Sequence, residues 1–414
     1  MATLPSLPAL AALFARIGVI SFGGVAGQLA LMHDEVVTRR RWLDEATYLR
    51  ALNFCMLLPG PEAQQLATFI GWRLHGWRGA LVTGTLFILP GALIVGALSW
   101  VAAAHGEAPL VAALFDGVKP VVVGIVAAAL WRLGRKTLTG WAPAALALAA
   151  LLALQVLHAP FPLVVIGAGL IGFLAGRFGS SVPAPAEPAT GSKGTVARHS
   201  ARVLGLAALF VALWAVPVFA VIALAGGIFP DLARLFTTSA FVTFGGAYAV
   251  LPYIADQAVA VQGWLTPGEM VDGLALAETT PGPTILVLEF VGFLAAWKQP
   301  GALEPALAGV LGALLVTYVT FLPSFLFILA GSPLIEHLAK APAATAALKA
   351  ITAAVVGVMA NLALFFGEAV LVPGGAVDWR AVAVAGVTVA AMLRFNVGVQ
   401  WLVLAGAGLG LIGG

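Results

Sequence analysis

The chain carries the same helix-breaking motifs twice, and the two copies keep a constant distance. Ser21-Phe22-Gly23-Gly24 recurs as Thr243-Phe244-Gly245-Gly246, and Leu58-Pro59-Gly60-Pro61 recurs as Thr280-Pro281-Gly282-Pro283. A third pair, Trp42-Leu43 and Trp264-Leu265, has the same offset of 222 residues (245 − 23, 282 − 60 and 264 − 42). The sequence is therefore an internal duplication, and both copies keep the sites at which a helix is expected to break.

The composition puts these breaks inside a membrane protein. Hydrophobic residues make up 61% of the chain and charged residues only 9%, whereas about a quarter of a soluble protein is charged. The mean hydropathy is +1.03, and apolar stretches of the length that crosses a bilayer, about 20 residues, run almost from end to end. The single Cys55 excludes an intramolecular disulfide and a cysteine metal cluster. Walker A and hydrolase motifs are absent, so we expect no enzyme activity, no metal and no cofactor.

We expect an all-α polytopic fold of two repeats joined by one extra helix. An N-terminal repeat over 1–178 precedes a Pro- and Ser-rich flexible linker over 179–202, which we expect in the cytoplasm. A linking transmembrane helix over 203–229 leads into a C-terminal repeat over 230–414. The apolar segments are predicted at 7–32, 45–75, 79–103, 110–131, 141–157 and 161–178, then 203–228, then 232–254, 268–297, 301–330, 344–367, 379–393 and 396–412.

The unpaired seventh segment predicts that the two repeats are inverted. One extra membrane-spanning segment makes the second repeat enter the membrane from the opposite face. The loop with Arg39, Arg40 and Arg41 matches the loop 256–263, which has no Lys or Arg. Because cytoplasmic loops are rich in Lys and Arg, matching loops of opposite character indicate opposite sides. Segments one and two either span fully or are re-entrant hairpins that meet near the bilayer midplane, and the sequence leaves both open.

The Pro-Gly-Pro sites predict half-helices that begin inside the membrane. Pro61 and Pro283 suit the first turn of a helix, and the N–H groups of 62–64 and 284–286 are then free. Such N–H groups and the positive end of the helix dipole favour an anion. The alternative is a plain proline kink. Ser21 and Thr243 add hydroxyl groups at the Phe-Gly-Gly sites, where the alternative is close helix packing through glycine.

Ionisable side chains inside the apolar segments are further candidates. Arg16 and Lys119 are cations that would balance an anion, although Arg16 alternatively reaches the interface and Lys119 alternatively pairs with Asp116. Glu62 and Glu289 are candidate proton carriers, and Glu62 alternatively caps a helix. The predicted substrate-binding residues are Arg16, Ser21, Phe22, Gly23, Gly24, Pro59, Gly60, Pro61, Glu62, Gln64, Lys119, Thr243, Phe244, Gly245, Gly246, Pro281, Gly282, Pro283 and Thr284.

These motifs resemble the chromate ion transporter family in its long, two-domain form. Phe-Gly-Gly, then Trp-Leu, then Pro-Gly-Pro before an apolar helix is similar to the repeated domain of that family, and Tyr48 to Gly71 (YLRALNFCMLLPGPEAQQLATFIG) resembles its long form. The resemblance covers about 7–178 and 230–412. It implies a multi-pass carrier of the bacterial inner membrane that exports chromate with proton coupling. The second copy departs from the first with Thr284 in place of Glu62.

Three functions remain open at this point: a chromate exporter, a sulfate or molybdate importer of the same architecture, and an intramembrane enzyme acting on a phosphorylated lipid. The expected partners are chromate or a related oxyanion, sulfate as a competitor, protons, the lipid bilayer and a second copy in a homodimer. No nucleic acid is expected.

Overall fold

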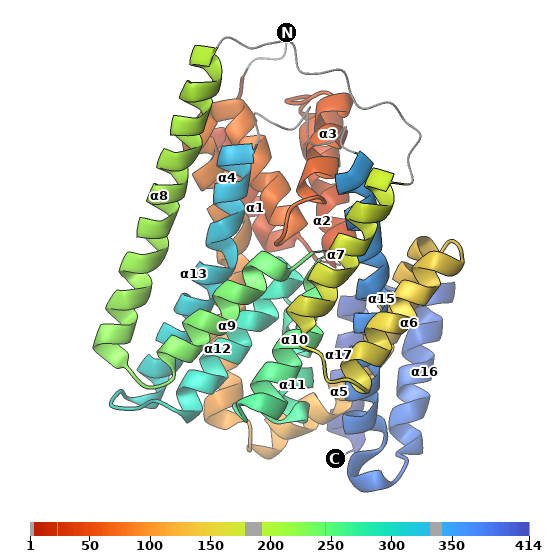
Figure 1. Ribbon diagram of the computed structural model, residues 1–414. Helices are drawn as coiled ribbons and strands as arrows, with labels where there is room; N and C mark the ends of the chain where they lie inside the picture. The colour runs from red at the N-terminus through yellow and green to blue at the C-terminus, as the bar shows by residue number, and fades with distance from the viewer. Residues whose placement is uncertain (1–3, 23, 179–192, 245, 332–341, 414) are drawn as a thin grey trace.

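The computed structural model describes residues 4–22, 24–178, 193–244, 246–331 and 342–413, which form helices and no strand. The helices stand roughly side by side in an upright bundle with α6, α7 and α16 on one flank and α8 on the other (Figure 1). In the first half the elements are α1 (Leu7–Ile20), α2 (Gly24–His33), the π-helix η1 (Asp34–Arg39), α3 (Glu45–Cys55), α4 (Glu62–His105), α5 (Pro109–Thr137), α6 (Trp141–Gln155) and α7 (Phe161–Phe178).

Helix α8 (Lys193–Ala225) connects the two halves. The sequence predicted a start at residue 203, so the helix begins ten residues earlier, within the predicted linker. The second half comprises α9 (Phe229–Val242), α10 (Ala247–Ala255), the π-helix η2 (Asp256–Val261), α11 (Pro267–Thr279), the 3-10 turn η3 (Thr284–Leu286), α12 (Val287–Lys298), α13 (Pro305–Gly331), α15 (Pro342–Leu371), η5 (Pro373–Gly375), α16 (Trp379–Arg394) and α17 (Val399–Gly413).

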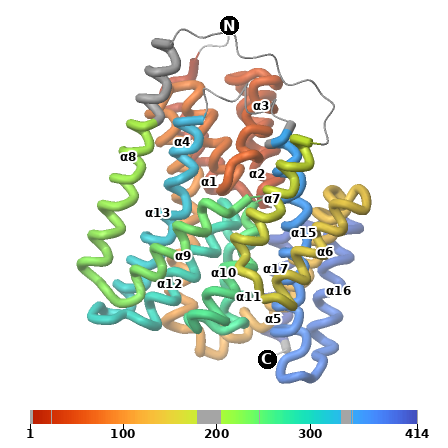
Figure 2. Tube along the Cα trace, in the orientation of Figure 1, coloured from red at the N-terminus to blue at the C-terminus, as the bar shows by residue number. Residues whose placement is uncertain are grey.

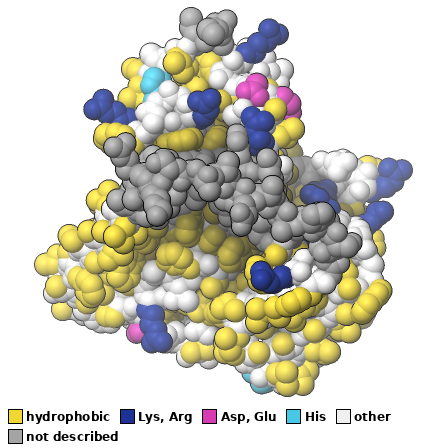
Figure 3. All heavy atoms as spheres, turned by 45° about the horizontal axis from the view of Figure 1, so that its top comes forward, with side chains coloured by type: hydrophobic (Ala, Val, Ile, Leu, Met, Phe, Trp, Pro, Cys, Tyr) yellow, Lys and Arg dark blue, Asp and Glu magenta, His cyan; other side chains and the backbone are white. Residues whose placement is uncertain are grey.

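Length and hydropathy identify this as an all-α polytopic membrane protein. Six helices of the described chain are long and apolar enough to cross a bilayer: Glu62–His105, Pro109–Thr137, Phe161–Phe178, Leu204–Ala225, Pro305–Gly331 and Thr345–Leu371. Hydrophobic side chains cover most of the surface below the upper lobe, whereas many of the Lys and Arg side chains in view lie on that lobe (Figure 3).

The two halves repeat each other in local geometry as well as in sequence. Both π-helices are followed by a tight turn, in which the Trp42 N–H donates to the Val36 carbonyl and the Trp264 N–H to the Ala258 carbonyl, both at 2.8 Å. Helices α3 and α11 are capped at matching positions by Asp44 and Thr266. Despite this likeness, α3 lies towards the upper end of the molecule and α11 towards the lower end (Figures 1 and 2).

Helix α4 folds back on itself at His75 and Gly76, where the backbone leaves the helical conformation. The sequence predicted separate segments at 45–75 and 79–103, and the kink divides them as expected. The Thr83 hydroxyl donates to the Ala67 carbonyl across the two arms (2.7 Å). Gly71 packs against the backbone of Gly79 so closely that neither has room for a side chain. The two arms of α4 therefore form an antiparallel hairpin.

Candidate functional site

Each Pro-Gly-Pro turn is hydrogen-bonded to the helix break of the other half. The Gly60 N–H donates to the Thr243 carbonyl at 2.7 Å, and the Gly282 N–H donates to the Ser21 carbonyl at 3.1 Å. We call the first contact crossing one and the second crossing two. Ser21 and Thr243 are the buried C-caps of α1 and α9. The two halves are thus interlocked by a reciprocal pair of backbone hydrogen bonds.

A second duplicated pair supports the crossings, and the sequence analysis missed it. Gly91 of α4 leaves no room for a side chain against the Pro281 carbonyl at crossing two. Ser324 of α13 takes the equivalent place at crossing one, where a Cβ on Gly60 would lie 2.9 Å from the Ser324 hydroxyl. Leu89-Pro90-Gly91 and Leu322-Pro323-Ser324 are 233 residues apart (324 − 91). A search at the 222 offset passes over this pair, whereas a search that allows insertions finds it.

Both crossings are built against α4. The first arm of α4 starts at Pro61, directly after Gly60, and runs antiparallel to the second arm. Gly84 on the second arm has no room for a side chain against Phe325, the neighbour of Ser324 at crossing one. Gly91 at crossing two is seven residues further on, which is about 10 Å along the helix.

Buried polar atoms without a partner collect at the crossings. Ser21 Oγ and Gln28 Oε1 at crossing two, and Gln65 Oε1 at crossing one, are buried and have no hydrogen-bond partner in the described part of the chain. The other ends of both amides are fixed: Gln28 Nε2 donates to the Gly282 carbonyl (2.5 Å) and Gln65 Nε2 to the Pro59 carbonyl (2.7 Å). Since buried polar groups in proteins are nearly always paired, these atoms are candidates to bond a water molecule or a polar ligand.

The two half-helices begin as the sequence predicted, with one difference. Gly60 and Gly282 have φ of +113° and +104°, a region that side chains rarely adopt. Pro61 and Pro283 are the N-caps, one residue before the predicted first-turn positions. In the second copy η3 uses one of the expected free donors, because the Leu286 N–H donates to the Pro283 carbonyl (2.9 Å).

Two carboxylates lie beside the half-helix starts. Glu62 is the first residue of α4 and is half-buried. Glu278 is buried at the end of α11, where it accepts from the Tyr248 hydroxyl (2.6 Å) and forms a side-chain hydrogen bond with Thr284. A dianion and an ionised carboxylate repel each other when they lie close together.

The remaining predicted residues lie at different places. Gln64 is buried and donates to the Thr68 hydroxyl (3.0 Å). Gly24 and Gly246 have φ of +69° and +93°, as a break at paired glycines requires. Phe22 is exposed and Phe244 half-buried, whereas Gly23 and Gly245 lie outside the described residues.

In the described part of the chain, no hydrogen bond or ion pair joins either predicted cation, Arg16 or Lys119, to the residues of the crossings. Arg16 is exposed on α1, five residues before Ser21, and has no ion-pair partner among the described residues. Arg39 and Arg40 both pair with the buried Glu35, although the Arg39 side chain is 61% exposed. These arginines therefore also neutralise a buried carboxylate within the fold.

Lys119 lies in a separate polar cavity of ≈ 800 Å³ between α4, α5, α11 and α12. Its ammonium is 2.7 Å from Asp116 and 3.9 Å from Asp272 of α11. Lys298 of α12 pairs with Glu269 of α11 at 2.6 Å. Partial burial opposes ionisation of Glu269, but its pKa is lowered overall by the Lys298 and Thr266 hydrogen bonds. Lys119 is thus already paired with carboxylates and ties α11 to α5.

The fold and the interlocked breaks define a class: a multi-pass, all-α membrane protein with duplicated, interrupted helices. Comparison with known sequences narrows this class. The sequence profile described as "Chromate transporter" matches residues 8–173 and 230–411, so the chain belongs to the chromate transporter family.

Relatives named as chromate transport proteins align with most of the chain. The "Chromate transport protein" of Cupriavidus metallidurans is 28% identical over 397 residues, which is 96% of this chain and 90% of that protein. The protein of the same name from Pseudomonas aeruginosa is 30% identical over 371 residues, 86% of this chain and 79% of its own. The "Probable chromate transport protein" of Synechococcus elongatus is 28% identical over 365 residues, 88% and 85% of the two chains. No solved structure matches this chain.

Proposed function

We propose that the protein is a secondary transporter that exports chromate across the inner membrane of a bacterium, and that it is not an enzyme. The reciprocal hydrogen bonds Gly60–Thr243 and Gly282–Ser21 are the observation that carries this proposal. They bring two half-helix starts and two helix breaks to neighbouring points against α4. Helix starts and hydroxyl groups in an enclosed site suit a tetrahedral oxyanion with two negative charges.

The architecture that goes with this function is a pair of inverted repeats, one over 1–178 and one over 230–414. The equivalent helices α3 and α11 lie towards opposite ends of the molecule, which supports an inverted arrangement of the repeats (Figure 1). The first arm of α4 runs only from Glu62 to the fold-back at His75, which is too short to cross a bilayer and supports a re-entrant hairpin that turns at the first Pro-Gly-Pro. Crossing one and crossing two would then exchange roles as the site opens to either side, which is the usual working mode of transporters built from repeats.

The membrane potential is sufficient to drive export. A dianion leaving a cell with a potential of about 100 mV, negative inside, gains about 4.6 kcal/mol at about 2.3 kcal/mol per charge. We also propose that export is coupled to protons. Glu62 and Glu278 are the groups whose protonation would alter the charge at the site. Sulfate competes in this view because its shape and charge are similar.

Transport into everted vesicles tests the proposal directly. Potential and pH gradient are imposed separately, with potassium and valinomycin for the first and an acid jump for the second. Uptake of chromate driven by a lumen-positive potential supports export, and a response to the pH gradient alone supports proton coupling. Growth on chromate with and without the gene, at low and high sulfate, completes the test. A gene that leaves chromate resistance unchanged but increases sulfate or molybdate uptake indicates the importer.

A further inference from the structure

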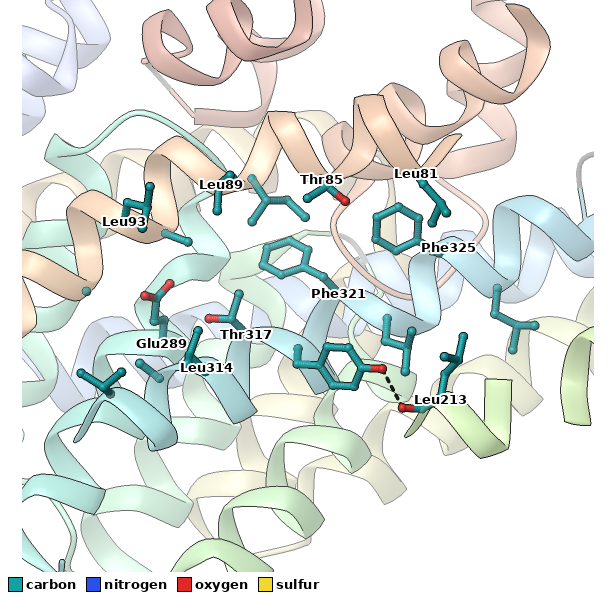
Figure 4. Close-up of a pocket in the computed structure, with 18 of the residues that line it drawn as sticks. Leu81, Thr85, Leu89, Leu93, Leu213, Glu289, Leu314, Thr317, Phe321 and Phe325 are labelled. Carbon is teal, nitrogen blue, oxygen red and sulfur yellow. Dashed lines mark hydrogen bonds between the residues drawn. The ribbon is translucent and has the colours of Figure 1, made fainter. Parts of the chain in front are cut away.

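An apolar cleft of ≈ 790 Å³ lies between α4, α8, α12 and α13 (Figure 4), and neither Gly60 nor Gly282 lines it. Its walls are leucine and aromatic side chains, and several of the leucines are exposed, among them Leu93 at 65% and Leu314 at 62%. Since α4, α8 and α13 are long enough to span the bilayer, exposed leucines on their flanks face lipid. A molecule reaches this cleft from the hydrocarbon phase rather than from water.

One ionisable carboxylate points into the cleft. Glu289 of α12 is 6% exposed, and its Oε2 has no hydrogen-bond partner among the described residues. Figure 4 shows its carboxylate directed towards the open space between α4 and α13, with Thr317 beside it. On the α4 side the neighbour is Gly96, where a Cβ would lie 3.1 Å from Glu289 Oε1. The missing side chain at Gly96 leaves the carboxylate accessible from the cleft.

No residue that lines the cleft supplies a positive charge to Glu289. The lining residues of the described chain are apolar or uncharged apart from this carboxylate. The hydroxyl of Tyr318, the other ionisable side chain, is occupied by the Leu213 carbonyl at 2.6 Å. Glu289 lies nine residues before Lys298, or roughly 13 Å along the helix, too far for the two to pair. An unpaired carboxylate at this depth is costly, so intramembrane carboxylates generally serve a ligand or a proton.

We propose that this cleft binds a hydrophobic cation, such as a quaternary ammonium or phosphonium ion with alkyl or aryl groups. Glu289 is the counter-ion, and the apolar walls hold the alkyl or aryl groups. Phe321 and Phe325 on α13 offer ring surfaces for cation–π contact (Figure 4). A lipid acyl chain would contact the same walls but would bring no positive charge to Glu289. The proposal concerns a site and a ligand separate from the oxyanion site, and it stands or falls independently of chromate transport.

Binding of tetraphenylphosphonium to the purified full-length protein in lipid nanodiscs tests the proposal. We expect saturable binding to the wild type and at least a tenfold weaker affinity for Glu289→Gln. Glu304→Gln, which removes an exposed carboxylate outside the cleft, is the matched control and should bind like the wild type. Dodecyltrimethylammonium should displace the probe, whereas dodecanol, with the same chain and no charge, should not.

A second variant protects the test against a folding defect in Glu289→Gln. Leu314→Trp changes an exposed wall residue, leaves Glu289 in place and narrows the cleft, so it should also weaken binding. Equal affinity of Glu289→Gln and the wild type, or equal displacement by dodecanol, would overturn the proposal and identify a lipid pocket. Absence of saturable binding to the wild type would overturn it as well.

Discussion

At the scale of single residues, the site depends on glycines that lie where two backbones touch. Gly282 needs a positive φ and also lies against Gly91, since a Cβ on Gly282 would be 3.3 Å from the Gly91 Cα. Gly60 is in the same position against Ser324 and Gln65. A side chain at Gly282 would press on the α4 backbone of the other half, and one at Gly60 would press on the side chains of Ser324 and Gln65.

Gly60→Leu and Gly282→Leu should each lower chromate uptake into everted vesicles at least twentyfold while the protein stays in the membrane. Gly263→Leu is the matched control, because Gly263 has φ of +62° and nothing within 4 Å of an added Cβ. Its cost is the positive φ alone, about 1–2 kcal/mol, so most transport should remain. Comparable losses in all three variants would show that backbone strain, and not contact at the crossings, causes the defect.

Arg16 is the cation that we propose to balance the charge of a bound dianion. A dianion needs about two positive charges, and two helix starts supply about one. Arg16 lies five residues before Ser21, about 7.5 Å along α1. Arg16→Gln should raise the KM for chromate at least tenfold. Arg135→Gln removes another exposed arginine, at the end of α5, and should change the KM less than twofold. An unaltered KM in Arg16→Gln removes this residue from the site.

At the scale of elements, the two equivalent helices α3 and α11 are held differently. Helix α11 is tied to α5 by Lys119–Asp272 and to α12 by Lys298–Glu269. The equivalent positions on α3 are Thr47 and Arg50, which bond to each other (2.9 Å). Helix α3 is tied to α2 instead, through the His33–Glu45 pair (2.7 Å). The duplication thus kept the helices and changed what holds their ends.

A charge swap separates a tether from an anion ligand at Lys119. Lys119→Gln leaves the half-buried Asp272 without its cation, so it should lower stability by about 1–3 kcal/mol and reduce transport. If Lys119 is a tether, the double variant Lys119→Asp/Asp272→Lys should recover thermal stability and transport. If Lys119 binds the anion, stability recovers and transport does not. Asp116→Asn is the control, because Asp116 is 70% exposed and should contribute little.

At the scale of the whole molecule, the proposed inversion predicts that matching loops face opposite sides of the membrane. Thr38 in η1 and Val261 in η2 are both exposed, and Cys55 is buried. In a Cys55→Ser background, Thr38→Cys should react with an impermeant maleimide only in everted vesicles. Val261→Cys should react only in right-side-out cells. Labelling of both from the same side would contradict inverted repeats and the alternating use of the two crossings.

The sequence by itself determined the class of the protein, the duplication and the places where helices break. These features are local: hydropathy reports the solvent of a segment, and proline or glycine ends a helix wherever it stands. For this reason the break predicted between 75 and 79 is present, and the Pro-Gly-Pro helix starts lie within one residue of their predicted positions.

Only the tertiary structure decided which break meets which. No local pattern states that Gly60 bonds to Thr243 and Gly282 to Ser21, since partners 183 (243 − 60) and 261 (282 − 21) residues apart are chosen by the packing of whole helix faces. The roles of Gly91 and Ser324 were hidden because the inserted residues shift their offset from 222 to 233. The pairing of Lys119 with α11 and the exposure of Arg16 likewise depend on the orientation of helix faces in three dimensions.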